Sequence, residues 1–242
     1  MAFRSRTRRE VAQLLHYDLP PGQPSGQDRL VADVDTQFFA VADGVGGSSD
    51  GALAAEAACE AFVKYAPSFR LGIQAVLEAL PEVYSELHRA VKETGSVTTF
   101  TGSVVTDDGY VAWLHAGDSR LFYLPASGDL YELTQPQHDP NARHQLLNAL
   151  GGDHDRLTLR PNSTHSHLPI WGFERLSEGD RLVFATDGLG PIGFDGMNDE
   201  YQWWMESAVR SVGQTAVATV NKIFSASHII DDGTIVIADI EA

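Results

Sequence analysis

The sequence predicts an α+β domain in which mainly antiparallel strands are accompanied by helices. Two hairpins indicate the antiparallel strands: residues 30–34 are expected to pair with 38–42, and residues 98–106 with 110–116 across an Asp-Asp-Gly turn. Apolar residues at helical spacing indicate helices between and after these hairpins. The expected helices are 51–65, 70–93 and 201–224, and the further strands are 117–124, 130–134, 182–186 and 234–240.

The first hairpin ends at an acidic, glycine-rich turn. Residues 38–42 form a short, continuous apolar run, which suits a strand that is covered on both faces. Asp43 follows directly, and the glycines after it let the backbone turn sharply and approach a ligand closely. The sequence therefore predicts an aspartate at the end of a buried strand, just before the helix 51–65.

Residue content excludes two interpretations of this turn. A phosphate-binding Walker loop needs a Gly-Lys-Ser/Thr sequence after the glycines, and the next lysine is Lys64. An EF-hand calcium loop needs acids or amides at alternate positions, where Val45 and Gly47 stand instead. Taken alone, the turn is either a lone metal-type carboxylate or a polar turn.

In three segments the sequence predicts structure that is less regular than a continuous helix or strand. Pro81 predicts a kink or break in the helix 70–93. Residues 135–175 are rich in proline, glycine and histidine, which predicts a long surface insertion, and residues 1–20 are expected to form a basic N-terminal arm. His165 and His167 could bind zinc, but no cysteine is nearby, so solvated loop histidines are the expectation.

Composition indicates one soluble globular domain over residues 1–242. Hydrophobic content of 43% and charged content of 21% are ordinary for such a protein, and no apolar run is long enough to span a membrane. The net charge of −16 argues against nonspecific binding to nucleic acid, which requires clustered lysine and arginine. Cys59 is the single cysteine, and the basic N-terminus lacks the apolar core of a signal peptide, which predicts a cytoplasmic protein.

Aspartates follow buried strands at two further places. Asp118 lies in a Gly-Asp-Ser turn before the strand that ends at 124, and Asp187 precedes a glycine after the strand 182–186. Asp231 stands at the entrance of the closing strand. An aspartate beside a glycine at the end of a buried strand is thus found repeatedly, which is not expected by chance.

In this order, and with these flanking strands, the acidic motifs resemble those of the metal-dependent protein phosphatases of type 2C. The resemblance covers residues 27–240 and implies a four-layer α-β-β-α sandwich of two mainly antiparallel sheets flanked by helices, with a metal site at one end of the sandwich. The motifs are Asp28, Asp43-Gly44, Gly117-Asp118-Ser119-Arg120, Asp187-Gly188 and Asp231-Asp232-Gly233-Thr234.

The resemblance implies a binuclear Mn²⁺ or Mg²⁺ centre. Asp43 would bridge the two ions, and the Gly44 carbonyl would join one of them. Asp187 and Asp231 would hold the other ion. Small hard cations prefer such oxygen ligands, and without a cation the converging carboxylates would repel each other by roughly 1 kcal/mol per pair even in water.

The resemblance also implies parts for Asp28 and Asp118. Asp28 would orient the attacking water, and Asp118 with Asp187 would make the labile third metal site that some members have. The metal-activated water would then attack the phosphorus of phosphoserine or phosphothreonine without a covalent intermediate.

The chain departs from the family pattern where substrate phosphate is bound. Gln23 and Gly26 stand where members usually carry an arginine and an asparagine. Either Arg29, or an arginine of the insertion such as Arg143, substitutes, or the affinity for phosphate is lower. Val45 replaces a histidine acid found in many eukaryotic members.

Two functions remain open on the sequence. The first is an active phosphatase whose partners are phosphoserine or phosphothreonine proteins and a cognate Ser/Thr kinase that it opposes. The alternative is a catalytically weak pseudo-phosphatase that serves as a phosphate-sensing or partner-binding module, a function motivated by the missing arginine.

Overall fold

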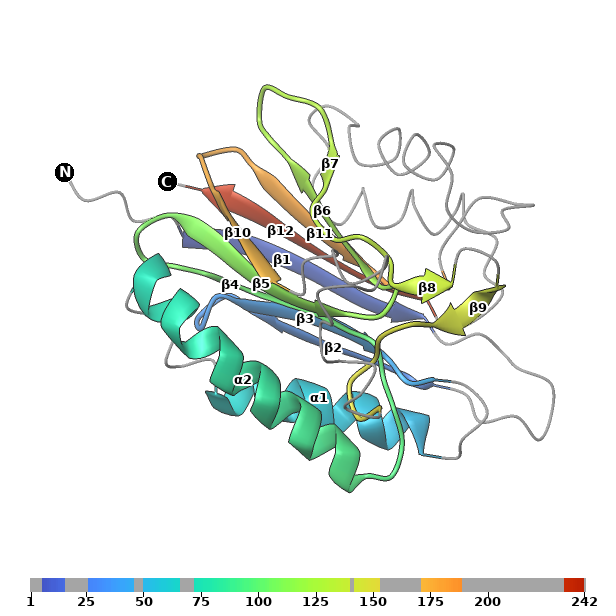
Figure 1. Ribbon diagram of the computed structural model, residues 1–242. Coiled ribbons are helices and arrows are strands. Elements are labelled where there is room, and N and C mark those ends of the chain that lie inside the picture. Colours follow the sequence, from blue (N-terminus) through green and yellow to red (C-terminus); the bar gives the residue numbers. More distant parts are fainter. Residues whose placement is uncertain are drawn as a thin grey trace.

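Two five-stranded sheets lie face to face, and two helices cover the outer face of one of them (Figure 1). The structure is a computed structural model that describes residues 6–15, 26–45, 50–65, 72–139, 142–152, 171–188 and 233–241. Its elements are β1 (Arg6–Leu15), β2 (Asp28–Asp33), β3 (Phe38–Asp43), α1 (Gly51–Tyr65), α2 (Ile73–Glu93), β4 (Phe100–Val105), β5 (Tyr110–Ala116), β6 (Arg120–Leu124), β7 (Tyr131–Glu132), β8 (His138–Asp139), β9 (Ala142–Leu146), β10 (Trp171–Arg175), β11 (Arg181–Ala185) and β12 (Gly233–Glu241).

All strand pairs in the described residues are antiparallel, as the hairpin signals predict. The helix-covered sheet has the order β10-β5-β4-β3-β2, and the second sheet has the order β1-β12-β11-β6-β7. The short strands β8 and β9 form a separate hairpin. The predicted α+β sandwich of two antiparallel sheets with flanking helices is thus confirmed, while the helix expected over 201–224 lies outside the described residues.

Strand β3 is buried on both faces, which explains its continuous apolar run. Phe39 and Val41 belong to the core between the sheets, where the Phe39 ring lies 6.4 Å from the Phe184 ring of β11. Phe38 and Ala40 point the other way, into the core beneath the helices. Because side chains alternate along a strand, one apolar run supplies both cores.

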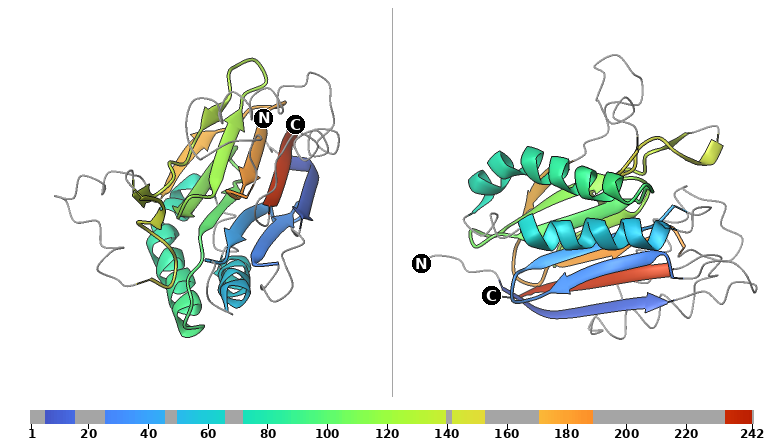
Figure 2. Two further views of the ribbon diagram at one scale, coloured as in Figure 1. Left: turned by 90° about the vertical axis from the view of Figure 1, so that its right-hand side faces the viewer. Right: turned by 90° about the horizontal axis from the view of Figure 1, so that it is seen from below.

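The two helices lie side by side over the helix-covered sheet (Figure 2). The Phe62 ring of α1 lies 5.7 Å from the Phe38 ring and 5.3 Å from the Phe100 ring, which fixes α1 on β3 and β4. Cys59 is buried in α1, and burial raises the pKa of its thiol to about 12. No helix in the described part of the chain combines the length and apolarity that a membrane span requires.

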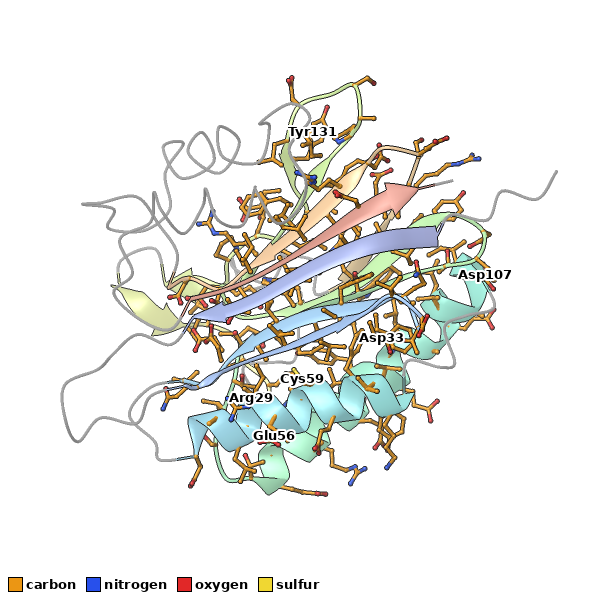
Figure 3. The ribbon with its side chains drawn as sticks, turned by 180° about the vertical axis from the view of Figure 1, so that it is seen from behind. Arg29, Asp33, Glu56, Cys59, Asp107 and Tyr131 are labelled. Carbon is orange, nitrogen blue, oxygen red and sulfur yellow. The ribbon has the colours of Figure 1, made fainter. Side chains whose placement is uncertain are left out.

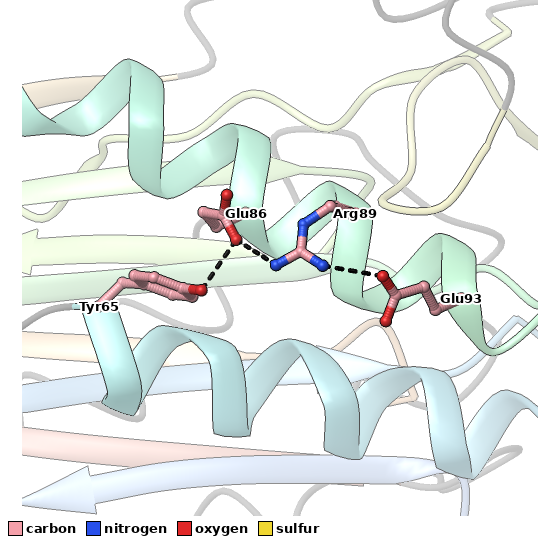
Figure 4. A network of polar contacts seen from close by, with 4 residues as sticks. All are labelled: Tyr65, Glu86, Arg89 and Glu93. Atoms are coloured by element: carbon pink, nitrogen blue, oxygen red, sulfur yellow. Dashed lines mark hydrogen bonds and ion pairs between the residues drawn. The ribbon is translucent and has the colours of Figure 1, made fainter.

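A polar network joins the exposed sides of the two helices (Figure 4). Tyr65 Oη donates a hydrogen bond to Glu86 Oε2 at 2.8 Å, and the Arg89 guanidinium contacts both Glu86 and Glu93. Hydrogen bonds from Arg89 and Tyr65 lower the pKa of Glu86. Salt screens such exposed pairs, so the apolar contacts beneath them hold the helices in place.

Helix α2 is continuous through Pro81, so the predicted break is wrong. Pro81 removes one backbone hydrogen bond, but Leu80 and Val83 on either side of it are buried against the helix-covered sheet. Ser85 Oγ also donates a hydrogen bond to the Pro81 carbonyl at 2.9 Å. Packing therefore keeps the helix unbroken on both sides of Pro81.

Two predictions about irregular segments are wrong in part. Residues 6–15 of the expected N-terminal arm form β1. The strand β12 is buried and pairs with β11 on one side, and β1 supplies hydrogen-bond partners for the backbone groups on its other side. Within the expected insertion 135–175, residues 171–175 form β10, which pairs with β5 at the edge of the helix-covered sheet. His165 and His167 lie outside the described residues.

Candidate metal centre

Asp28 and Asp43 lie opposite each other at one end of the helix-covered sheet. Asp28 begins β2, Asp43 ends β3, and the two are direct partners in the antiparallel register. Asp28 is fully buried, whereas Asp43 is half-buried. The first hairpin therefore brings together two of the acids that the sequence singles out.

Hydroxyl groups of the second sheet hold Asp28. Its Oδ2 accepts hydrogen bonds from Thr186 Oγ1 at 2.9 Å and from Thr234 Oγ1 at 2.6 Å. The Thr186 hydroxyl in turn accepts the backbone N–H of Thr234 at 2.8 Å. Because Thr186 directly precedes Asp187, this contact between the sheets brings Asp187 to the end of the sandwich where Asp43 lies.

Two threonines fix the backbone of Asp43. The Asp43 carbonyl accepts hydrogen bonds from the Thr99 N–H and from Thr98 Oγ1, both at 2.8 Å. The Asp43 N–H donates to Thr99 Oγ1 at 3.0 Å. The same hydroxyl lies 2.9 Å from Ser119 Oγ, so it also reaches the turn that carries Asp118.

Gly44 allows the start of α1 to pack directly on the acidic turn. A Cβ atom at residue 44 would lie 2.2 Å from the carbonyl oxygen of Gly51, the first residue of α1. A side chain at this position would force the helix away. The glycine expected to offer its carbonyl to a metal is thus required by the packing as well.

The turn that carries Asp118 is held from two sides. Gly117 has a φ of 109°, a conformation that favours glycine, and a Cβ there would lie 2.7 Å from Thr99 Cβ. Gln137 Oε1 accepts the Gly117 N–H at 3.0 Å, and the Gln137 N–H donates to the Gly117 carbonyl at 2.7 Å. Asp118 therefore has little freedom to move away from the other acids.

The acids influence one another strongly. Burial raises the pKa of Asp43 well above its usual range, and the nearby carboxylates of Asp28, Asp187 and Asp118 raise it further, as does a hydrogen bond with Asp187. Burial and the Asp187 carboxylate raise the pKa of Asp118 to about 7. Four acids from distant parts of the chain thus share one region of unfavourable negative charge.

The donor set fits a small divalent cation. Within the described residues no three carboxyl, imidazole or thiol groups converge closely enough to hold a metal by themselves. Asp231, the remaining expected ligand, lies outside the described residues. A cation would nevertheless relieve the repulsion that raises the pKa of Asp43, and carboxylate oxygens are the ligands that Mn²⁺ and Mg²⁺ prefer.

The structure does not bring Arg29 to the acids (Figure 3). Its guanidinium donates hydrogen bonds to the carbonyls of Gly26 and Asp28 at 2.6 and 2.8 Å, and it lies 3.9 Å from Glu56 of α1. Successive side chains of a strand point to opposite faces, so Arg29 faces α1 while Asp28 faces the second sheet. The side chain of Arg143, the other candidate, is outside the described residues.

Sequence reasoning did not assign the residues that hold the acids in place. Ser119 belongs to one of the acidic motifs, but its hydrogen bond and those of Thr98 and Thr99 were not predicted. Gln137 and Thr186 had no assigned part. The only available signal was position, because a hydroxyl next to an acid at a strand end is suited to hold a neighbouring turn.

Fold and site together define a class of protein: an α+β sandwich of two antiparallel sheets with a group of aspartates at one end. The family model described as Protein phosphatase 2C matches residues 22–225. The chain belongs to this family and is, by class, a protein serine/threonine phosphatase. None of the curated proteins matches the chain.

Solved bacterial structures share the fold over nearly the whole chain. PppA, described as a key regulatory component of T6SS in Pseudomonas aeruginosa, is similar at 17% identity with a TM-score of 0.71, covering 98% of this chain and 99% of PppA. The serine/threonine phosphatase PstP/Ppp of Mycobacterium tuberculosis is similar at 20% identity with a TM-score of 0.68, covering 97% and 99%. A PstP catalytic domain in complex with 2 manganese ions is similar at 20% identity with a TM-score of 0.67, covering 97% and 98%.

Proposed function

We propose that this chain hydrolyses phosphoserine and phosphothreonine in proteins with the help of two divalent cations, Mn²⁺ or Mg²⁺. The observation that carries the proposal is the group of aspartates whose charges raise the pKa of Asp43 and Asp118 at one end of the sandwich. Family membership supports the same chemistry, and the manganese ions of the PstP catalytic domain support the choice of cation.

In this proposal Asp43 would be a ligand shared by both cations, and its place at the end of β3 and its two threonine contacts keep it in position. The Gly44 carbonyl would be a ligand of one cation, and Asp187 and Asp231 would be ligands of the other. When bound, the cations activate water as the nucleophile and neutralise charge on the phosphoryl oxygens. Asp28, held by two threonine hydroxyls, orients the water.

Asp118 and Asp187 together supply a third, more weakly held cation site. The Asp187 carboxylate contributes to the raised pKa of Asp118, which supports their closeness. Burial also raises the pKa of Asp118. A bound cation would therefore stabilise the ionised carboxylate of Asp118 at neutral pH.

The proposed partners are phosphoproteins and the Ser/Thr kinase whose products the chain removes. The proposed compartment is the cytoplasm, since the single cysteine is buried and has no partner for an internal disulfide.

Hydrolysis assays with and without chelator test the proposal. We expect turnover of an aryl phosphate and of a phosphothreonine peptide with Mn²⁺, and its loss with excess chelator. Asp43→Asn should reduce turnover by at least about 100-fold, because a bridging ligand is removed. Asp107→Asn is the matched control. Asp107 is exposed in the turn between β4 and β5, at the end of the sheet opposite to Asp43 (Figure 3).

The environment of Arg29 favours a second candidate function, a phosphate-sensing or partner-binding module with poor turnover. Its guanidinium is engaged by two backbone carbonyls and lies near Glu56, so Arg29 does not supply the arginine that family members usually use for substrate phosphate. If Mn²⁺ binds to the wild-type chain but no phosphate ester is hydrolysed under any metal, this second function replaces the first.

A further inference from the structure

Strand β10 is an edge strand with unusually apolar exposed residues. Trp171 and Phe173 are 46% and 47% exposed, and within the described residues no strand lies on the side of β10 that faces away from β5. Charged side chains, proline or a bulge usually discourage pairing at an edge strand; β10 has no proline and no bulge, and its charged residues are Glu174 and Arg175. An exposed, regular, aromatic edge of this kind is suited to pair with another strand.

The backbone groups of alternate residues point away from β5. Leu176 directly follows β10, and Gly109 directly precedes β5. The Leu176 N–H donates to the Gly109 carbonyl at 2.9 Å, so it points toward β5. Because the backbone groups of an antiparallel strand alternate in direction, Trp171, Phe173 and Arg175 present theirs to the outside. The Arg175 N–H also points away from β5, where it donates to Glu174 Oε1 at 2.9 Å, so pairing with another strand has to replace this hydrogen bond.

The same three residues share one side-chain face. A Cβ at Gly172 would meet the Trp113 ring at 2.3 Å, so the side-chain position of residue 172 points into the core between the sheets. Trp171, Phe173 and Arg175 therefore point to the helix-covered face. There the Phe173 ring packs edge-on against Tyr110, with ring centroids 6.3 Å apart.

We propose that β10 pairs with β10 of a second copy of this chain, antiparallel about a two-fold axis at Phe173. In this register Phe173 lies opposite its own copy and the two aromatic rings meet. Trp171 lies opposite Arg175 of the second copy, where the guanidinium can stack on the indole ring. Gly172 lies opposite Glu174, so no two like charges face each other.

The proposed dimer is weak and depends on salt. A five-residue strand buries less surface than a stable interface, which needs more than about 1,000 Å². Each chain carries a net charge of −16, so two copies repel each other at low ionic strength. The dimer should therefore tighten as salt is raised, opposite to an association held by ion pairs.

Sedimentation of the full chain at increasing concentration and at low and high salt tests this proposal. We expect a monomer–dimer equilibrium at high micromolar concentration that shifts toward dimer in high salt. Phe173→Lys places two positive charges opposite each other and should weaken the dimer at least about tenfold. Tyr131→Lys is the matched control, because Tyr131 is an equally exposed aromatic residue, 53%, on the edge strand of the second sheet (Figure 3).

A cysteine at the symmetry axis tests the register. In paired strands, opposite Cα atoms lie about 5.5 Å apart, within reach of a disulfide, so mild oxidation should cross-link Phe173→Cys but not Tyr131→Cys. Cys59 is buried in α1 and is not expected to interfere. A chain that stays monomeric in high salt, or a dimer that Phe173→Lys leaves unchanged, would overturn the proposal, whether or not the chain hydrolyses phosphate esters.

Discussion

At the scale of single residues, Thr99 connects two of the acids. Its hydroxyl accepts the Asp43 N–H and contacts Ser119 beside Asp118, and the residue is buried. Thr99→Val keeps the shape but leaves the Asp43 N–H without its acceptor, which should cost roughly 1–3 kcal/mol in the free energy of unfolding. We expect kcat to fall with little change in KM, because Asp43 loses its fixed position.

Urea unfolding and steady-state kinetics on the same preparations check this prediction. Thr99→Ser retains the hydroxyl and should restore most of the turnover. Wild-type kcat in Thr99→Val would mean that the strand alone positions Asp43.

His115 makes the stability of the fold dependent on pH. It is buried, with Nδ1 2.9 Å from Thr101 Oγ1 and Nε2 3.0 Å from the Gln135 carbonyl, and burial lowers its pKa to about 4. Between pH 6.5 and 4 the unfolded chain takes up a proton that the folded chain does not. The free energy of unfolding should therefore be unaffected by this group above pH 6.5 and fall below it, by at most about 1.4 kcal/mol per pH unit.

Urea unfolding of the wild type and of His115→Gln over this pH range measures that contribution. The difference in stability between the two proteins should shift in favour of the variant as the pH falls. A constant difference from pH 7 to 4 would show that His115 titrates normally in the folded protein.

The acids could be predicted from the sequence, whereas their supports could not. Asp28, Asp43, Asp118 and Asp187 each stand at a strand end or in a glycine turn, and this local pattern singles them out. The hydrogen bond from Thr234 to Asp28 joins residues 206 apart in the chain, and nothing local to either residue indicates it. Contacts of this kind depend on how the sheets stack.

At the scale of elements, the β4–β5 turn also starts a helix. Gly72 precedes α2 and has no side chain to cap it, and both carboxylate oxygens of Asp108 lie 3.1 Å from the Ile73 N–H. Thr106 Oγ1 donates to the same carboxylate at 2.5 Å. From the sequence this aspartate pair was expected only in the hairpin turn, because the helix that Asp108 caps begins 35 residues earlier in the chain.

Asp108→Ala should lower the free energy of unfolding by about 1 kcal/mol, the usual cost of losing a helix cap. Thermal or urea unfolding measures this loss. Its neighbour Asp107 is exposed and makes the matched control, so Asp107→Ala should be close to neutral. Equal effects of the two substitutions would contradict a cap from Asp108.

Elements with a strong local pattern could be predicted, whereas two of the edge strands, β1 and β10, could not. The helix 51–65 and the strand 110–116 have the predicted bounds, because each has a clear hydrophobic period and a turn beside it. The strands β1 and β10 were expected to be an arm and part of an insertion. Both lie at sheet edges, where pairing with one neighbour, and not an apolar pattern, determines the strand.

At the scale of the whole molecule, the acidic end should make stability depend on cations. A cation that binds only the folded chain at 100 times its dissociation constant adds about 2.7 kcal/mol to the free energy of unfolding. For a chain of this size, that corresponds to a rise in Tm of several degrees, roughly 2–4 °C per kcal/mol. Without cations, Asp43→Asn should be at least as stable as the wild type, because one of the mutually repelling charges is gone.

Calorimetry of both proteins with Mn²⁺ and with chelator checks this prediction. Mn²⁺ should raise the Tm of the wild type and have a much smaller effect on Asp43→Asn. Identical shifts in the two proteins would place the cation somewhere other than Asp43.

The most direct measurement is a crystal structure of the wild-type chain grown with Mn²⁺, with the ions located by their anomalous scattering. The account predicts two manganese ions at the end of the sandwich, bridged by the Asp43 carboxylate, with Asp187 and Asp231 as further ligands. Manganese bound elsewhere, or the three carboxylates pointing to separate places in saturating Mn²⁺, would contradict it.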